Sequence, residues 1–529
     1  MTWGLWNTFE ANVAKHPHKA ALIYLAKRSW KRISYGELLD SANRLVHGLQ
    51  ACRAQPGMCV ALMIPPSADF FALAFALLKT GLVPVVIDPA IGLKNVTTCL
   101  NETKPEIFIG NTLTHILRII LGWGKDSVKH NLTLDGIKSQ SSKAEQYSSP
   151  QLSISSPAAI IYTSGSTGLP KGAIYTQGNF AAQLDMLRET FNITQDEIDL
   201  PAFPLYAIID LLLGATSVIP DINFPVPGKT DPKKVINAIQ QFNVTNMFAS
   251  PVVLDILANY GMRHNAKLDG LKRVITAGAP APFRVQEKFK RLLSGDARLF
   301  GIYGATESLP IAMIDSEEVL HETRDKSAQG VGICLGVPVK EAQVRIIQIT
   351  DGPIEIWQDS LEVETNVVGE ITVQGPAVTR EYITREEINR LAKIQKNNEI
   401  IHRMGDVGYF DEYGRLWYCG RKSQRAETNS GTFFTEQIEG IFNAHPYVFR
   451  TALVGVNREP VLWVEPQHNV QDKDKIEREL IELGKDHPQA SQIKTFLFMK
   501  KFPTDVRHNS KIIREQLTRL AIKRMETFS

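Results

Sequence analysis

The chain has 529 residues, of which 43% are hydrophobic and 22% are charged, and its formal net charge at pH 7 is +3. That length exceeds what one hydrophobic core supports, so we expect two or more domains. The near-neutral charge gives no argument for nucleic-acid binding. The five cysteines are scattered and lack a CxxC spacing, which argues against a zinc site and against a disulfide framework.

The sequence shows no pattern for export or for crossing a membrane. Residues 1–7 lack the basic and then apolar run of a signal peptide, and no stretch reaches the about 18–20 uncharged apolar residues that span a bilayer. We therefore expect a cytoplasmic protein without a transmembrane segment. Residues 116–123 are apolar apart from Arg118 and could touch a membrane surface, although a core element is the favoured interpretation.

Residue patterns in the first part of the chain predict alternating helices and strands. Ser34 and Glu37 have the spacing of a capping box at the start of a helix. Strands at 59–64 and 83–87 flank a helix at 68–80, and this βαβ unit is typical of a parallel sheet. Residues 124–156 are polar and poor in large apolar residues, so we expect surface loops there.

An apolar strand at 158–162 leads into a loop rich in glycine and hydroxyl residues. Glycine permits close backbone approach, so successive N–H groups can point at a phosphate, and Lys171 adds a positive charge. The loop differs from the Walker pattern because Lys171 follows Pro170 and no serine or threonine comes directly after it. We predict a polyphosphate-binding loop, with an ordinary surface turn as the alternative. Its candidate residues are Thr163, Ser164, Gly165, Ser166, Thr167, Gly168 and Lys171.

Two later strands also end in small or polar residues. The predicted strand at 273–277 is followed by Gly278 and Ala279, and the predicted strand at 298–302 is followed by the motif Tyr303–Glu307. A doubly wound sheet binds its ligand at such carboxyl ends of strands. We therefore expect these two strand ends and Thr163 to share one crevice.

From about residue 336 the pattern changes to short strands at 343–347 and 370–374 and to a hairpin of 407–409 with 416–419. These strands predict a β-rich subdomain. Charged residues become denser around 420–423, where we place a hinge. The predicted fold class is α/β. A large N-terminal domain at 1–420, with doubly wound sheets and the β-rich subdomain, precedes a small mobile α+β C-terminal domain at 421–529, and the hinge lies near Arg421–Ser423.

Five motifs follow one another in the order of the adenylate-forming superfamily, which the chain strongly resembles. They are the phosphate loop, residues 303–307, residues 404–408, Gly420–Arg421 and Lys511. That superfamily contains acyl-CoA synthetases, luciferases and the adenylation domains of peptide synthetases. The resemblance covers nearly the whole chain and implies ATP and Mg²⁺ as cofactors. It also implies a reaction in which a carboxylate attacks the α-phosphorus of ATP and expels pyrophosphate. Because two anions meet, cations and hydrogen-bond donors must neutralise the developing charge.

The resemblance implies a role for each nucleotide-binding motif. The phosphate loop would hold the β- and γ-phosphates. Tyr303 would stack on adenine, and Gly278 and Ala279 would line the base. Thr306 would contact the α-phosphate, and Glu307 would hold Mg²⁺.

The resemblance places three further residues at the ribose and at the reacting groups. Asp406 would accept hydrogen bonds from the ribose hydroxyls with the help of Arg421, and Lys511 would bridge the substrate carboxylate and the α-phosphate. Without the motif context Asp406 would be an ordinary loop carboxylate, and Lys511, in a basic segment, would be a solvated lysine. The candidate catalytic residues are Lys171, Thr306, Glu307 and Lys511.

Two positions depart from the acyl-CoA synthetase pattern. Ala207 stands where those enzymes usually carry a histidine, and Ser423 stands at the hinge where they usually carry an aspartate. Because both groups serve the CoA-dependent step, the departures put that step in doubt. Several stretches instead resemble the β-lactone synthetases of bacterial long-chain olefin biosynthesis. These stretches are 199–204, 216–221, 402–410, 416–422 and 505–511.

That branch implies a 2-alkyl-3-hydroxy fatty acid as substrate, activated as the acyl-AMP and then closed to a β-lactone by its own β-hydroxyl. Other olefin-biosynthesis enzymes are the implied partners. A long-chain fatty acyl-CoA synthetase, with CoA as acceptor, is the alternative, and a non-catalytic acyl- or nucleotide-binding scaffold is the second. His402 and His508 are candidate bases by type and place only, and hydrogen bonding or packing is the favoured role of each. Residues 203–213 could line an acyl pocket, but a buried core helix fits them equally well.

Overall fold

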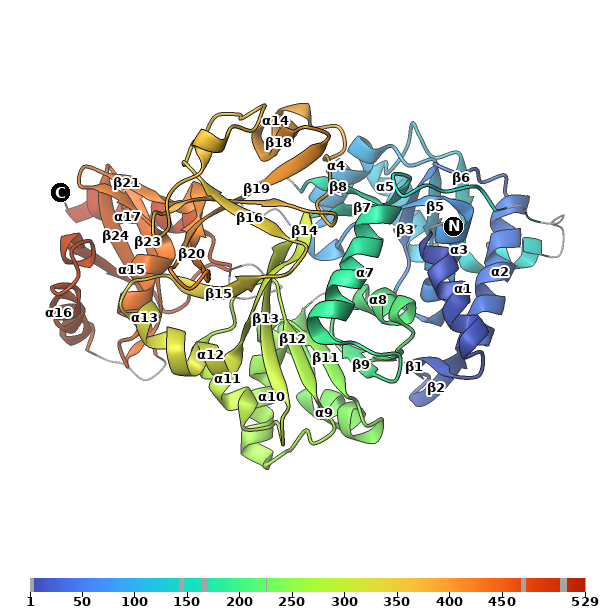
Figure 1. Cartoon of the computed structure of the whole chain (residues 1–529), viewed down its shortest axis with the longest axis horizontal. Coiled ribbons are helices and arrows are strands. Elements are labelled where there is room, and N and C mark those ends of the chain that lie inside the picture. Colours follow the sequence, from blue (N-terminus) through green and yellow to red (C-terminus); the bar gives the residue numbers. More distant parts are fainter. Residues whose placement is uncertain are drawn as a thin grey trace.

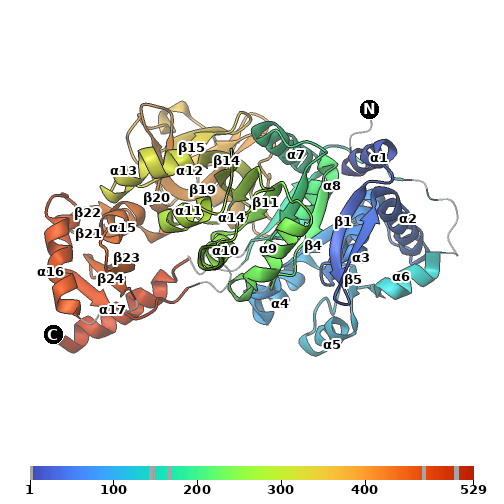
Figure 2. The ribbon, with the colours of Figure 1, turned by 90° about the horizontal axis from the view of Figure 1, so that it is seen from below.

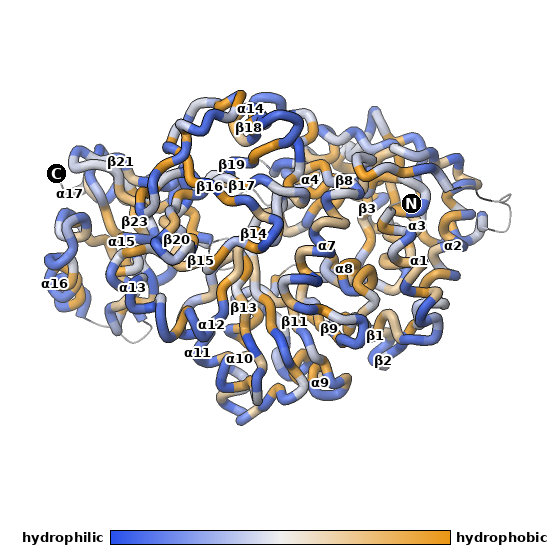
Figure 3. The backbone as a smooth tube through the Cα atoms, viewed as in Figure 1, coloured by the Kyte–Doolittle hydropathy of each residue, from blue (hydrophilic) through white to orange (hydrophobic). Residues whose placement is uncertain are grey.

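The computed structural model describes residues 4–141, 147, 149–163, 170–224, 226–467, 472–504 and 511–528. Their strands form two large sheets, a three-stranded sheet and a two-stranded ribbon. Figure 1 shows the N-terminal elements at one end of the long axis and the C-terminal elements at the other. In Figure 3, hydrophobic and hydrophilic segments alternate along many of the helices, as expected for helices with one face on a core.

The first sheet has six strands and positions the phosphate loop. Its order is β6 (His130–Leu132), β5 (Ile107–Gly110), β3 (Cys59–Met63), β4 (Val83–Val86), β7 (Pro157–Tyr162) and β8 (Gly172–Thr176). All neighbouring strands are parallel except β7 and β8, which form an antiparallel pair. The loop therefore connects two adjacent strands at the edge of the sheet, β7 and β8.

The second sheet has fourteen strands and changes character along its width. One half is parallel and comprises β13 (Arg298–Ala305), β12 (Arg273–Thr276), β11 (Asn246–Ala249), β9 (Ile198–Pro201), β10 (Thr216–Ile219) and β1 (Ala20–Ala26), with β2 (Ser29–Ser34) antiparallel at the edge. The other half is antiparallel and comprises β14 (Ser308–Asp315), β15 (Ile333–Pro338), β20 (Leu416–Arg421), β19 (Glu399–Phe410), β17 (Gly369–Gln374) and β16 (Gln343–Ile347), with β18 (Lys393–Lys396) against β19.

Helices pack around these two sheets. They include α1 (Leu5–Lys15), α2 (Tyr35–Ala51), α3 (Ala68–Thr80), α4 (Leu93–Thr103), α5 (Thr112–Leu121), α6 (Leu134–Gln140), α7 (Gln177–Phe191), α8 (Tyr206–Leu213), α9 (Pro232–Gln241), α10 (Pro251–His264), α11 (Phe283–Lys290), α12 (Ser316–Glu318), α13 (Arg324–Ala328) and α14 (Glu386–Ala392). The largest core cluster joins α1, α2 and α3, where Phe9 stacks on Phe75 with ring centroids 3.9 Å apart. Helix α2 begins with the predicted capping box of Ser34 and Glu37.

The C-terminal elements form a unit with its own core. It contains the ribbon β21 (Ala426–Thr428) and β22 (Gly431–Phe433), the sheet β23 (Val448–Val456), β24 (Glu459–Pro466) and β25 (Thr495–Phe498), and the helices α15 (Thr435–Asn443), α16 (Lys473–Gly484) and α17 (Arg514–Phe528). Two core clusters are built only from residues 426–525. Figure 2 shows these elements beside the larger body.

The predicted α/β fold class is confirmed, and most predicted elements match within a few residues. Helix α3 has the predicted bounds because Ser67 caps its start and Gly81, at φ +67°, ends it. The prediction of surface loops at 124–156 was wrong in part, since β6 and α6 lie there and Ile137 is fully buried. The boundary at 420 and the hinge stay predictions. Among the described residues, no helix is long and apolar enough to cross a bilayer.

Candidate active site

Thr306 and Glu307 form the turn between the antiparallel strands β13 and β14. The turn needs Gly304, because a Cβ there would lie 2.8 Å from the carbonyl oxygen of Ser308. Glu307 is 8% exposed, and its Oε1 accepts a hydrogen bond of 2.5 Å from the hydroxyl of Tyr382. Its backbone oxygen accepts another from the N–H of Thr379 at 2.9 Å. The carboxylate proposed for Mg²⁺ is therefore held in place by two residues of the segment before α14.

Tyr382 is flanked by two lysines. Nζ of Lys171 lies 5.4 Å and Nζ of Lys393 lies 5.3 Å from the ring centroid, distances at which an ammonium is attracted to an aromatic face. Lys393 is buried and donates to the carbonyl oxygen of Thr379 at 2.5 Å and to its Oγ1 at 3.3 Å. Burial lowers the pKa of Lys393 to about 7, although the nearby Glu307 carboxylate opposes that shift.

Lys171 and Thr163 close the neck of the predicted phosphate loop. The N–H of Thr163 donates to the carbonyl oxygen of Lys171 at 2.9 Å, and the N–H of Lys171 donates to Oγ1 of Thr163 at 3.4 Å. Burial lowers the pKa of Lys171, the Glu307 carboxylate opposes the shift, and the charges of Arg385 and Arg421 add to it. Several cations thus lie near one carboxylate. The loop candidates Ser164, Gly165, Ser166, Thr167 and Gly168 lie outside the described residues.

Asp406 lies on β19 opposite Arg421 on β20, so the hairpin register brings the two predicted ribose residues together. An Nη of Arg421 lies 3.0 Å from Oδ1 of Asp406, and the hydroxyl of Tyr303 donates to Oδ2 at 2.7 Å. Asp406 is 3% exposed. Burial raises the pKa of Asp406, whereas the charges of Arg421 and Lys511 and the hydrogen bond from Tyr303 lower it.

That effect on Asp406 places Lys511 of the C-terminal unit close to the proposed ribose site. Lys511 lies just before α17, and the pair of Thr504 with Ile512 brackets the segment that carries it. His508 falls in that segment and lies outside the described residues. The role of Lys511 as the catalytic lysine stays a prediction.

Gly278 and Ala279 lie directly after β12, which pairs with β13. Gly278 has φ +93°, a backbone conformation that favours glycine over residues with a Cβ. The turn after β12 therefore lies beside β13, the strand that carries Tyr303, where the base of a nucleotide is predicted to bind.

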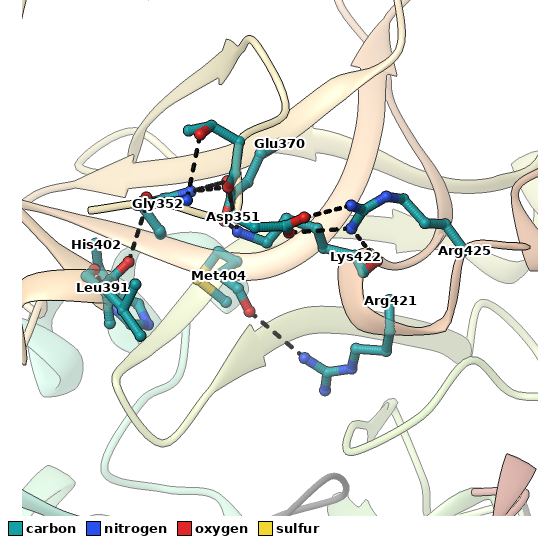
Figure 4. A network of polar contacts seen from close by, with 12 residues as sticks. Asp351, Gly352, Glu370, Leu391, His402, Met404, Arg421, Lys422 and Arg425 are labelled. Carbon is teal, nitrogen blue, oxygen red and sulfur yellow. Dashed lines mark hydrogen bonds and ion pairs between the residues drawn. The ribbon is translucent and has the colours of Figure 1, made fainter. Parts of the chain in front are cut away.

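A buried ion-pair network surrounds the predicted hinge (Figure 4). Glu370 pairs with Arg403 at 2.6 Å and with Lys422 at 3.0 Å, and all three side chains are largely buried. Next along the chain, Arg425 pairs with Asp351 at 2.6 Å. The segment that enters the C-terminal unit is thus fastened to the β-rich strands.

His402 precedes Arg403 on β19, and its side chain contacts Ala392 and Tyr382. Its Nδ1 lies 3.1 Å from the carbonyl oxygen of Ala392, and its ring packs edge-on against Tyr382. Burial lowers the pKa of His402 well below its ordinary value, and the charge of Lys393 adds to that shift. These contacts fit the hydrogen-bonding and packing role favoured above.

The donor set fits a nucleotide with a hard cation. Oδ1 of Asp406 is buried and forms an ion pair with Arg421, but within the part of the chain that is described it accepts no hydrogen bond, so a ribose hydroxyl could donate one to it. Carboxylate oxygen suits Mg²⁺, which usually takes one or two protein carboxylates and fills its other positions with phosphate oxygens and water. Within the described ranges, no three histidine, cysteine, aspartate or glutamate side chains lie close enough together to hold a metal ion.

Three residues at the site were missed by the sequence reasoning. Tyr382 donates to the Glu307 carboxylate, Lys393 donates to the backbone oxygen of Thr379, and the hydroxyl of Tyr175 donates to the backbone oxygen of Thr306. Only Lys393 carries a signal, because it is a lysine between Ala392 and Ile394 in an apolar strand pattern. The two tyrosines have ordinary strand or loop surroundings in the sequence.

Comparisons with known proteins identify the class. A family model described as AMP-binding enzyme matches residues 9–383. The chain belongs to this family, and the expectation of an adenylate-forming enzyme is confirmed. Its fold is similar to that of O-succinylbenzoate coenzyme A synthetase from Bacillus subtilis in complex with AMP, with a TM-score of 0.77, 20% identity, and coverage of 97% of this chain and 98% of that one.

Two curated relatives are much more similar in sequence. The olefin beta-lactone synthetase of Xanthomonas campestris pv. campestris is 40% identical over 92% of this chain and 90% of the relative. That of Stenotrophomonas maltophilia is 38% identical over 93% of this chain and 92% of the relative. The resemblance to this branch, predicted from short stretches, therefore extends over almost the full length of both relatives.

Proposed function

We propose that this enzyme converts a 2-alkyl-3-hydroxy fatty acid and ATP to a β-lactone, AMP and pyrophosphate. The observation that carries the proposal is the 40% identity to an olefin beta-lactone synthetase across nine-tenths of both chains. The converging carboxylates and cations around Glu307 and Asp406 support the adenylation half of the reaction. Other olefin-biosynthesis enzymes would supply the hydroxy acid and consume the lactone.

In the adenylation step, the chain's own groups bring two anions together. Lys171 and the phosphate loop bind the terminal phosphates, Asp406 with Arg421 binds the ribose, and Tyr303 with Gly278 and Ala279 borders the base. Thr306 contacts the α-phosphate. Mg²⁺ held by Glu307 would neutralise phosphate charge when bound. Lys511 orients the substrate carboxylate against the α-phosphorus, and these cations lower the barrier by offsetting the developing charge.

In the second step, the bond from the substrate β-oxygen to the carbonyl carbon forms and the bond from that carbon to the AMP oxygen breaks. The hydroxyl proton is released to water, and AMP carries away the electron pair of the broken bond. Because the nucleophile is tethered to the carbonyl, its high effective concentration offsets part of the ring strain. This step needs no CoA, which agrees with Ala207, fully buried in α8, and with Ser423 at the hinge position.

The proposal includes the two-domain division at 420 and 421. We expect adenylation to require Lys511 close to Asp406, and the effect of the Lys511 charge on the pKa of Asp406 supports this position. A rotation at the predicted hinge would carry Lys511 away, and the pairs of Lys422 with Glu370 and of Arg425 with Asp351 would resist that rotation. A cyclising enzyme has less need to rotate than an enzyme that must admit CoA.

A pair of matched substrates tests the proposal. The purified enzyme would receive ATP and Mg²⁺ without CoA, together with either a 2-alkyl-3-hydroxy fatty acid or the same acid without its 3-hydroxyl. We expect pyrophosphate release to continue over many turnovers with the hydroxy acid and to stop after a single turnover with the other acid, whose adenylate has no internal nucleophile and keeps its AMP. A stop after one turnover with both acids, relieved by CoA, would contradict the proposal.

A further inference from the structure

Helix α5 presents its most apolar side chains to solvent. The exposed fractions are 64% for Leu113, 49% for Ile116, 74% for Ile119 and 71% for Ile120. Their spacing of three and four residues places them on one face of the helix, and none of the residues of α5 is buried. The interpretation of 116–123 as a core element is therefore correct only in part, because Leu117, Leu121 and Trp123 pack against a core cluster whereas the three isoleucines of the stretch are exposed.

The inner face of α5 combines two leucines with two polar side chains, since Leu117 and Leu121 are partly buried against a core cluster that contains Phe108. His115 lies 3.0 Å from the carbonyl oxygen of Leu132, and its ring packs on Phe108. The guanidinium of Arg118 also lies over Phe108, and its Nη1 donates to the carbonyl oxygen of Trp123 at 3.3 Å. A surface helix of a soluble protein normally buries its apolar stripe and exposes its charges. Helix α5 packs two leucines inward but exposes four further apolar side chains on its outer face.

This orientation is fixed by contacts at both ends of the helix. Asn111 and Thr114 form a capping box at the start, and Gly122, at φ +67°, ends the helix. The indole N–H of Trp123 donates to Oγ1 of Thr97 on α4 at 2.7 Å, which joins the end of α5 to its neighbour. Figure 2 shows α5 at the periphery of the molecule. These contacts fix the position of α5 so that its apolar outer face stays exposed.

The exposed charged residues in the segments before and after α5 are mainly positive. Four exposed lysines lie on α4, at its end, or in the segment after α5: Lys94, Lys104, Lys125 and Lys129. Nearby acidic groups are engaged, since Glu102 pairs with Arg385 and Glu106 accepts from the N–H of Cys59. Asp126 is the exposed acidic residue among them.

We propose that the face formed by Leu113, Ile116, Ile119 and Ile120 inserts into the surface of a membrane that contains anionic lipids. An apolar stripe parallel to the surface enters the boundary between headgroups and acyl chains, and flanking lysines attract anionic headgroups. The combination of an outward apolar face with exposed lysines at its border fits a lipid surface better than it fits another protein of mixed charge. The inference goes beyond the reaction and is independent of it.

The test is co-sedimentation of the full-length protein with vesicles of phosphatidylglycerol and phosphatidylcholine, and with vesicles of phosphatidylcholine alone. We expect binding to the anionic vesicles and weaker binding to the neutral ones. The double variant Ile119→Glu/Ile120→Glu should lower the affinity at least about tenfold, because two anions then face the lipid. Lys125→Gln/Lys129→Gln should lower it less, and only for anionic vesicles.

The matched control is Ile356→Glu, since Ile356 is also 71% exposed but lies far along the chain, in the β-rich region. This variant should bind vesicles as the wild type does. Equal vesicle binding by the wild type and the Ile119→Glu/Ile120→Glu variant would overturn the proposal. So would absence of binding to anionic vesicles, or a wild-type oligomer that dissociates in the double variant, because that result would identify the face as a protein interface. Adenylation of detergent-dispersed substrate should be unchanged in all variants.

Discussion

The hydroxyl of Tyr382 donates a hydrogen bond of 2.5 Å to Oε1 of Glu307. This contact joins the turn between β13 and β14 to a segment some seventy-five positions away in the chain. Lys393 supports the same segment through Thr379, so the proposed metal ligand is positioned by a small buried network. The first two predictions concern this network.

Tyr382→Phe removes the hydrogen bond and keeps the ring between its two lysines. Hydrogen bonds to charged groups contribute about 1.5–3 kcal/mol, so we expect the Mg²⁺ concentration for half-maximal adenylation to rise about tenfold or more. ATP–pyrophosphate exchange, titrated with Mg²⁺, measures this change. Tyr409→Phe is the control, because the hydroxyl of Tyr409 donates to the backbone oxygen of Val331 away from the site. An unchanged Mg²⁺ requirement in Tyr382→Phe would rule out the positioning role.

Lys393→Met should change how stability depends on pH. Burial lowers the pKa of Lys393 to about 7, whereas the unfolded chain keeps the ordinary value near 10.4. Between these values the unfolded state binds the extra proton, so the free energy of unfolding rises with pH, by at most about 1.4 kcal/mol per pH unit.

The wild type should therefore gain more stability than the Lys393→Met variant between pH 7 and pH 9, as measured by urea unfolding. Lys396→Met, on the same strand β18, is the control and should keep the wild-type dependence. The same dependence on pH in wild type and Lys393→Met would show that Lys393 is not held neutral by burial.

A second pH effect involves the buried carboxyl groups of Asp199 on β9 and Asp210 on α8. Burial raises the pKa of both, and the charge of Asp210 raises that of Asp199 further. Oδ2 of Asp210 accepts a hydrogen bond of 2.8 Å from Ser217. Above the ordinary pKa of about 3.9 the unfolded chain loses protons that the folded chain keeps, so this contribution to stability is lost as the pH rises.

Asp210→Asn replaces the protonated acid by a neutral group of the same shape. We expect the variant to lose less stability than the wild type between pH 5 and pH 8, measured by thermal unfolding at each pH. Asp40→Asn, at an exposed position of α2, should leave the dependence unchanged. If stability fell more steeply with pH in Asp210→Asn than in the wild type, the raised pKa values of Asp199 and Asp210 would be contradicted.

Lys511→Ala separates binding from chemistry. The variant should bind ATP nearly as the wild type does, because the groups proposed to bind the nucleotide lie on the large sheets, and it should lose adenylation. Calorimetry with ATP and pyrophosphate exchange with the hydroxy acid give the two readings. Lys501→Ala, an exposed lysine of the same unit, is the control. Unimpaired exchange in Lys511→Ala would remove this residue from the mechanism.

Local sequence signals predicted the parts of the fold that local physics determines. Helix α3 follows from an apolar run between a serine cap and a glycine stop, and the pairing of Asp406 with Arg421 follows from a short hairpin. The contact of Tyr382 with Glu307 could not be predicted in this way. It depends on Tyr382 pairing with Ala173 at the edge of the other sheet, which is a long-range event.

The orientation of α5 shows the same limit. Periodicity identifies an amphipathic stretch around Ile116 and Ile119, and the usual assumption then buries its apolar face. Leu117 and Leu121 pack inward together with His115, and four other apolar side chains stay exposed, which the sequence period alone does not show. Weak strand and helix signals at 130–140 were missed because these elements are short and polar.

The central claim is that the product is a β-lactone made without CoA. Proton NMR of the products tests it most directly, with purified enzyme, ATP, Mg²⁺ and a racemic 2-alkyl-3-hydroxy fatty acid, in the presence and absence of CoA. We predict ring-proton signals of a β-lactone in both samples. A thioester formed only in the sample with CoA, with no ring signals in either, would contradict the account.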